Sequence, residues 1–243
     1  REIAKASTHR NRCRPISKLR GITKKVRSGI EAKAKKPLVD VIVDQAGQKG
    51  TGKWAAIESQ TLGVNASAIE AAVDARIISS MKDERVKAEK AYKIPSKKIS
   101  KASRAKVLKQ LEGALYAGKI AAYAQGFAVL ETASKQYEWN LPLGTVAAIW
   151  RGGCSIRSQF LGEITKAYSK TNGGNLLMAP AFIKMMKKDH MALRAVVALS
   201  AASGAPAPAL SNALSYFDGY RLARGAANLI QGQRDFFGAH GFG

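Results

Sequence analysis

Hydrophobic residues recur at helical spacing through the middle of the chain. Leu108, Leu111, Leu115, Gly118 and Ala122 fall three or four positions apart, as on one face of an α-helix. A second apolar set lies on another face of the same stretch: Ile120, Tyr123, Phe127 and Leu130. The pattern predicts a long helix, apolar nearly all round and interrupted by Lys119, which is typical of a helix buried in the middle of a bundle.

Two further stretches have the same period. Residues 66–81 carry Ile69, Val73 and Ile77 at i, i+4 and i+8, and an amphipathic segment begins at Phe182 and runs to about residue 203. We interpret Met185 and Met186 in that segment as core residues. Residues with helix-breaking backbone preferences separate the helical stretches, at 93–96, 140–144, 172–175 and 204–208. Only residues 38–43 are typical of a strand, and they are few, so the sequence predicts an all-α fold.

Composition agrees with a globular protein of one large or two small domains. The chain has 243 residues, of which 46% are hydrophobic. It contains no uncharged apolar run of about 18 residues, so we expect no transmembrane helix, and its N-terminus lacks the apolar core of a signal peptide. Cys13 and Cys154 lie far apart, which predicts neither a disulfide framework nor a metal site and favours a reducing, cytoplasmic compartment.

Positive charge is extreme and unevenly distributed. The formal net charge is +23. Residues 1–36 hold thirteen Lys or Arg against two acidic residues, and residues 82–109 hold eleven against three. Such surface attracts polyanions, including nucleic acid, nonspecifically and in a salt-dependent way. Alternatively, the charge forms a solvated basic face or guides an anionic metabolite. Because the first basic run contains no aromatic residue, the stacking expected of single-strand binding is missing.

A glycine-rich segment provides the strongest candidate chemistry. Residues 46–54 read Ala-Gly-Gln-Lys-Gly-Thr-Gly-Lys-Trp. Glycines allow backbone N–H groups to converge on one anion, to which Lys and Thr add charge and a hydroxyl donor. The segment nearly fits the P-loop pattern G-x-x-x-x-G-K-[ST], but Trp54 stands where that motif needs a hydroxyl to hold magnesium. Two interpretations of this segment remain: a phosphate site that is not a P-loop, and a surface turn without a ligand.

Several blocks in the rest of the chain decide between them. They are residues 46–54, 74–76, 82–86, 114–117, 123–127, 150–158, 213–220 and 233–240. In this order the blocks resemble decarboxylating 6-phosphogluconate dehydrogenase over roughly residues 37–240. The resemblance implies the all-helical C-terminal domain of that family, which forms most of the interface of an intertwined homodimer. The family reaction is the NADP-dependent oxidative decarboxylation of 6-phosphogluconate to ribulose 5-phosphate in the pentose phosphate pathway.

The resemblance also implies which residues contact the substrate. Lys49, Thr51 and Arg76 would hold the 6-phosphate, which as a dianion favours charge-assisted donors and bidentate binding by Arg. Arg234 and His240 would reach the substrate in the neighbouring subunit's active site, making the dimer obligatory for activity.

Essential parts of the family's catalytic apparatus do not occur in the sequence. No G-x-G-x-x-G turn follows a strand, so NADP would bind through an N-terminal domain absent from this chain. The motif that supplies the family's lysine base and glutamate acid is also absent. We therefore expect no catalytic residue and no turnover in these 243 residues alone.

The sequence predicts one domain boundary and leaves two hypotheses for the function of the chain. Residues 37–243 form the helical substrate-binding and dimerisation domain, and residues 1–36 form a basic segment. Pro15 and the arginines near it do not fit an amphipathic helix there, so the segment is a diverged arm, a lead without fixed structure, or a stretch with an erroneous sequence. Under the first hypothesis, the chain is the C-terminal domain of a 6-phosphogluconate dehydrogenase. The alternative is a noncatalytic basic protein, derived from that domain, which binds nucleic acid or a large complex.

Overall fold

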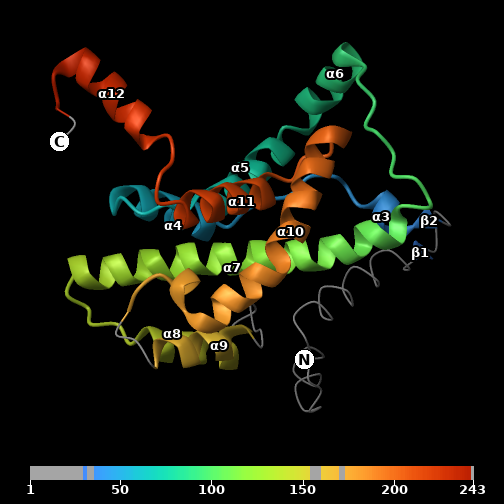
Figure 1. Cartoon of the computed structure of the whole chain (residues 1–243). Coiled ribbons are helices and arrows are strands. Elements are labelled where there is room, and N and C mark those ends of the chain that lie inside the picture. The colour runs from blue at the N-terminus through green and yellow to red at the C-terminus, as the bar shows by residue number, and fades with distance from the viewer. Residues whose placement is uncertain (1–29, 32–35, 154–159, 170–172, 242–243) are drawn as a thin grey trace.

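The computed structural model describes residues 30–31, 36–153, 160–169 and 173–241, and its architecture is helical (Figure 1). The described elements are β1 (Ile30–Glu31), β2 (Lys36–Pro37), α3 (Leu38–Val41), α4 (Thr51–Thr61), α5 (Ser67–Ser80), α6 (Lys82–Tyr92), α7 (Arg104–Gln136), α8 (Leu143–Gly153), α9 (Phe160–Tyr168), the 3₁₀ turn η1 (Leu176–Met178), α10 (Pro180–Ser203), α11 (Pro208–Arg221) and α12 (Ala227–Gly238). The two-residue strands β1 and β2 pair antiparallel. The predicted all-α fold is confirmed.

Helix α7 is the axis of the molecule. Figure 1 shows it as a long rod with α8 and α9 on one side, α5 and α11 on the other, and α10 crossing it. Ile120 and Phe127 are fully buried, as their periodicity predicts, whereas Leu108 and Leu115 on the other predicted apolar face are 55% and 40% exposed. Lys119 is half-buried, its ammonium lies 5.8 Å from the centroid of the Tyr123 ring, and burial lowers the pKa of this lysine.

Aromatic side chains fill the space between α7, α8, α9 and α10. The ring of Phe127 stacks at 5.4 Å on Tyr168 and lies 5.5 Å from Trp150. Phe160 meets Phe182 edge to face at 5.1 Å. Burying such large side chains supplies most of the hydrophobic stabilisation of a core of this size. Phe182 and Met186 are buried and Met185 packs against the same core, which confirms their interpretation as core residues.

The start of α5 is held by a side chain from α7. Gln125 is fully buried. Its Oε1 accepts from the amide of Ala68 at 3.1 Å, and its Nε2 donates to Asn65 Oδ1 at 3.0 Å and to Ser67 Oγ at 3.1 Å. The first amides of a helix have no partner within the helix, so Gln125 provides a cap from a distant part of the chain. This contact fixes α5 against the central helix.

Four of the sequence predictions concern particular segments of the chain. The helices predicted at residues 66–81 and from Phe182 to about residue 203 correspond to α5 and α10, which confirms them. Within the strand-like stretch of residues 38–43, Leu38–Val41 instead form the helical turn α3. The proposed basic segment 1–36 lies outside the described residues except for Ile30, Glu31 and Lys36.

Candidate functional site

The glycine-rich segment forms a turn that leads directly into α4. Gly50 precedes the helix with φ of 95°, a left-handed conformation that glycine adopts without a steric penalty. Its carbonyl accepts from the amide of Trp54 at 2.9 Å, the first hydrogen bond of the helix. The free amides of a first turn and the helix dipole favour an anion at this end. Lys49 and Thr51 flank Gly50 and are exposed.

The turn is seated on α5 at two points. On one side the amide of Ala46 donates to Ser79 Oγ at 3.0 Å. On the other, a Cβ at Gly52 would come within 2.9 Å of Val73 Cγ2, so α4 approaches α5 closely there. Arg76 lies between these contacts, three residues from each, on the same face of the helix. The fold therefore brings the turn that carries Lys49 and Thr51 alongside the part of α5 that carries Arg76.

The charges at this turn are available to a ligand. Lys49, Thr51 and Arg76 are exposed. Within the described part of the chain, neither Lys49 nor Arg76 forms an ion pair. The first turn of α4 contains no acidic residue. The placement of the turn on α5 gives Arg76 a specific neighbour, which distinguishes it from other exposed helix cations.

Arg234 and His240 lie elsewhere, on and after α12. Figure 1 shows this helix apart from the rest of the molecule, and none of its residues is buried. The chain folds back after the helix, since the amide of Gly241 donates to Asp235 Oδ1 at 2.6 Å, which leaves His240 beside Gly238. The structure of this chain does not bring these two residues to the turn at α4.

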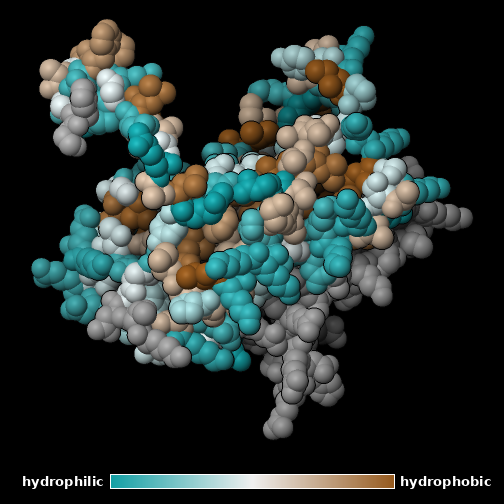
Figure 2. Space-filling model, viewed as in Figure 1, coloured by the Kyte–Doolittle hydropathy of each residue, from teal (hydrophilic) through white to brown (hydrophobic). Residues whose placement is uncertain are grey.

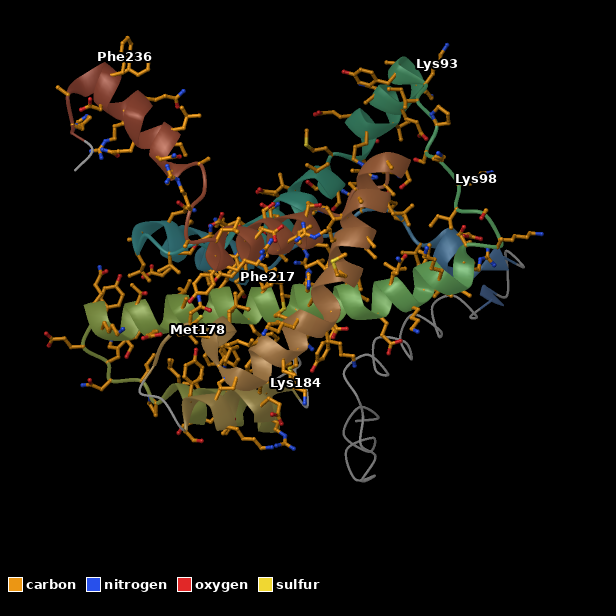
Figure 3. All side chains as sticks on the ribbon, viewed as in Figure 1. Lys93, Lys98, Met178, Lys184, Phe217 and Phe236 are labelled. Carbon is orange, nitrogen blue, oxygen red and sulfur yellow. The ribbon has the colours of Figure 1, made fainter. Side chains whose placement is uncertain are left out.

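Several large apolar side chains on α12 are exposed to solvent. Phe236 and Phe237 are each 85% exposed, and Leu229 and Ile230 are more than half exposed. Figure 2 shows hydrophobic atoms on this isolated helix, and Figure 3 shows Phe236 pointing outward. Exposed apolar surface of this kind indicates a protein-protein contact.

A pocket next to the C-terminal half of α7 is lined by none of the predicted site residues. It has a volume of about 760 Å³ and is lined by Glu131, Tyr168 and several hydroxyl side chains. Two of its polar groups already have partners: Glu131 accepts from the amide of Gly174 and from Lys135 Nζ, and Ser134 Oγ accepts from the amide of Leu141. Because no residue predicted to bind a ligand lines this pocket, we place the candidate site at the turn.

Other kinds of site do not occur among the described residues. They contain no cluster of three or more His, Cys, Asp or Glu able to hold a metal ion. No helix in the described ranges is long and apolar enough to cross a membrane. The glycine-rich turn follows a helical turn and a loop instead of a parallel strand, so it does not fit the dinucleotide site that NADP requires.

Comparisons with known proteins identify the family. The family model described as "6-phosphogluconate dehydrogenase, C-terminal domain" matches residues 2–243. The chain belongs to the 6-phosphogluconate dehydrogenase family. A decarboxylating 6-phosphogluconate dehydrogenase of Citrobacter freundii is 46% identical over 240 residues, covering 98% of this chain and 54% of that protein. One from Drosophila melanogaster is 48% identical over 204 residues, covering 84% and 42%.

A solved structure agrees with this assignment. The 6-phosphogluconate dehydrogenase of Plasmodium falciparum superposes with a TM-score of 0.86 at 36% identity, covering 92% of this chain and 48% of that one. That enzyme was determined alone, with its cofactor NADP+ and with its substrate 6-phosphogluconate. This chain spans about half the length of the relatives it matches. The family model also takes in the first basic segment, and the boundary at residues 36–37 stays a prediction.

Two residues that hold the turn and α5 in place could not be identified from the sequence. Ser79 and Gln125 act through backbone atoms 33 and 57 residues away, so local patterns contain no signal for them. Part of the matched block 150–158, including Arg157, lies outside the described residues.

Proposed function

We propose that this chain supplies the phosphate-binding site and the dimer interface of an NADP-dependent, decarboxylating 6-phosphogluconate dehydrogenase of the pentose phosphate pathway. The observation that carries the proposal is the seating of the glycine-rich turn on α5, with Arg76 between its two contacts. Lys49 and Arg76 supply charge, Thr51 supplies a hydroxyl donor, and the first amides of α4 complete an anion site. A sugar acid phosphate dianion matches this set of donors.

The dimer completes the site. Because α12 leaves its apolar residues uncovered, we infer that it packs on a second copy of the chain. There Arg234 and His240 contact the substrate held by Lys49, Thr51 and Arg76 of the other subunit. Placing part of the site on the partner would make a monomer bind substrate weakly.

The chemistry itself requires groups that this sequence lacks. The residues of this chain bind and orient the substrate, while hydride acceptance by NADP and the acid and base steps belong to the family's other domain. We expect the purified chain to form no NADPH from 6-phosphogluconate. Turnover by these 243 residues would contradict this part of the proposal.

Calorimetric titration of the chain with 6-phosphogluconate tests the proposal. Arg76→Ala should weaken binding by about ten- to a hundredfold, as expected for charge-assisted hydrogen bonds to a phosphate. Lys87→Ala removes another exposed helix cation and serves as the control, with affinity unchanged. Equal losses in both variants would indicate nonspecific attraction by net charge.

A second candidate function rests on the segment between α6 and α7. Residues 90–111 contain eight cationic residues and no acidic one. None of the eight forms an ion pair with a described residue. Figure 3 shows Lys93 and Lys98 along this exposed segment. Such a surface favours nonspecific binding of nucleic acid or another polyanion.

Fluorescence anisotropy with a labelled DNA duplex, at several salt concentrations, tests this second candidate. This candidate predicts that the affinity for DNA falls steeply as salt is added, and that Arg76→Ala leaves this behaviour unchanged. The double variant Lys97→Ala, Lys98→Ala should make the affinity less dependent on salt. Absence of binding at low salt would eliminate it.

A further inference from the structure

The loop that precedes the glycine-rich turn is tied down by an arginine from α6. Arg85 Nη1 donates to the carbonyls of Asp44 and Ser79, at 3.1 Å each, and Nη2 pairs with the Asp44 carboxylate. One guanidinium thus joins three elements: the loop at residue 44, the end of α5 and the start of α6. The fork geometry of Arg suits several acceptors at once, which an ammonium does not reproduce.

A serine at the end of α5 continues this connection towards the turn. Ser79 Oγ accepts from the amide of Ala46 at 3.0 Å and lies 3.1 Å from the Ala46 carbonyl and 2.8 Å from the Arg76 carbonyl. The hydroxyl proton donates to one of these carbonyls at a time. Beside it, Gln45 Nε2 donates to the Ser80 carbonyl at 3.2 Å. The last carbonyls of α5, which lack helical partners, therefore hold the loop.

Beyond these anchors the turn has little packing of its own. A Cβ at Gly47 would meet nothing within 4 Å, and one at Gly50 would meet only the Trp54 ring at 3.9 Å. Glycine-rich backbone loses much conformational entropy when it is ordered. A ligand that had to order the turn would bind more weakly than one that met a turn already in place.

We propose that Arg85 and Ser79 are positioning residues, which hold the glycine-rich turn on α5 so that its amides face Arg76 before a phosphate arrives. This inference rests on the proposed function, since it concerns the same phosphate site. Neither residue contacts the ligand. The main-chain contacts carry the effect, because the Asp44 carboxylate is 76% exposed and exposed ion pairs contribute little.

The test combines two measurements on the 243-residue chain: 6-phosphogluconate affinity by calorimetry, and hydrogen exchange of residues 45–50 without ligand. Ser79→Ala and Arg85→Lys should each weaken binding about five- to tenfold, as for one lost hydrogen bond or two, and should speed exchange in the loop. Ser79→Thr retains the hydroxyl and should restore both readouts. Asp44→Asn retains the main-chain acceptor and should have a small effect.

Controls separate positioning from general stability. Lys87→Ala removes a cation from the same helix as Arg85 without touching the loop, and should leave both readouts unchanged. Thermal unfolding of every variant identifies those that fail to fold, and Ser79→Ala is the mildest of them. If the wild-type chain binds and the folded variants bind equally well, this inference alone is overturned. If the wild-type chain does not bind 6-phosphogluconate, the proposed function falls and this inference with it.

Discussion

The candidate phosphate site depends at the residue scale on one backbone conformation. Gly50 takes φ of 95° immediately before α4, where any other residue would be strained, whereas Gly47 has no positive φ and open space around it. Anion-binding chemistry makes Lys49 and Thr51 predictable from the sequence. Arg76 is not predictable in this way, because an exposed helix cation has no local signature and only the resemblance selects it.

Gly50→Ala should therefore lower the free energy of unfolding by about 1–2 kcal/mol and weaken 6-phosphogluconate binding. Gly47→Ala is the matched control and should be tolerated in both assays. Urea unfolding and calorimetry measure the two effects. Equal behaviour of the two variants would show that the left-handed turn is not needed.

A pH effect is expected from Asp218 on α11. Arg194 donates to its carboxylate at 2.7 Å and Arg221 at 2.9 Å, and these contacts lower the pKa of Asp218. A depressed carboxyl pKa stabilises the folded state above the pKa of an unfolded Asp, about 3.9, and this contribution is lost as the pH falls through the folded pKa. Asp218→Asn should therefore cost about 1 kcal/mol at pH 7 and progressively less below about pH 4. A cost that did not change with pH would contradict the assignment.

At the scale of elements, periodicity is sufficient for the long helices and fails where tertiary contacts decide. Helices α5, α7 and α10 follow from apolar spacing, although part of the spaced set is exposed: Ile77 on α5, and Leu108 and Leu115 on α7, each expose at least 40% of their surface. Residues 38–43 are rich in the β-branched residues typical of a strand, yet Leu38–Val41 form the helical turn α3, since so short a segment has no fixed preference. The cap that Gln125 gives α5 could not be predicted, because its partners lie 57 to 60 residues away.

Replacing Gln125 tests how α5 is held. Gln125→Leu leaves the Ala68 amide and the Asn65 side chain without their partner and should cost about 1–3 kcal/mol of unfolding free energy. Gln136→Leu, at the exposed end of the same helix, should cost little. Chemical denaturation of both variants distinguishes the buried cap from a general effect of removing an amide.

For the whole molecule, the proposed site depends on α12, the helix that stands apart from the rest of the fold. The resemblance implies that Arg234 and His240 act in a neighbouring subunit, and the fold agrees in so far as α12 stands apart with exposed Phe236 and Phe237. No sequence pattern reveals which surface covers this helix, because in the proposed dimer that surface belongs to a second copy of the chain. The proposed site therefore has two parts on two chains.

Mixed dimers of two variants test whether the phosphate site is shared between two chains. Arg76→Ala and Arg234→Ala, each alone, should bind 6-phosphogluconate weakly. After the two chains are unfolded together and refolded, half of the dimers pair unlike subunits, and each of these holds one intact site. About one quarter of the wild-type binding capacity should therefore be recovered, at wild-type affinity. Mixed dimers that recover no tight site would contradict a phosphate site shared between subunits.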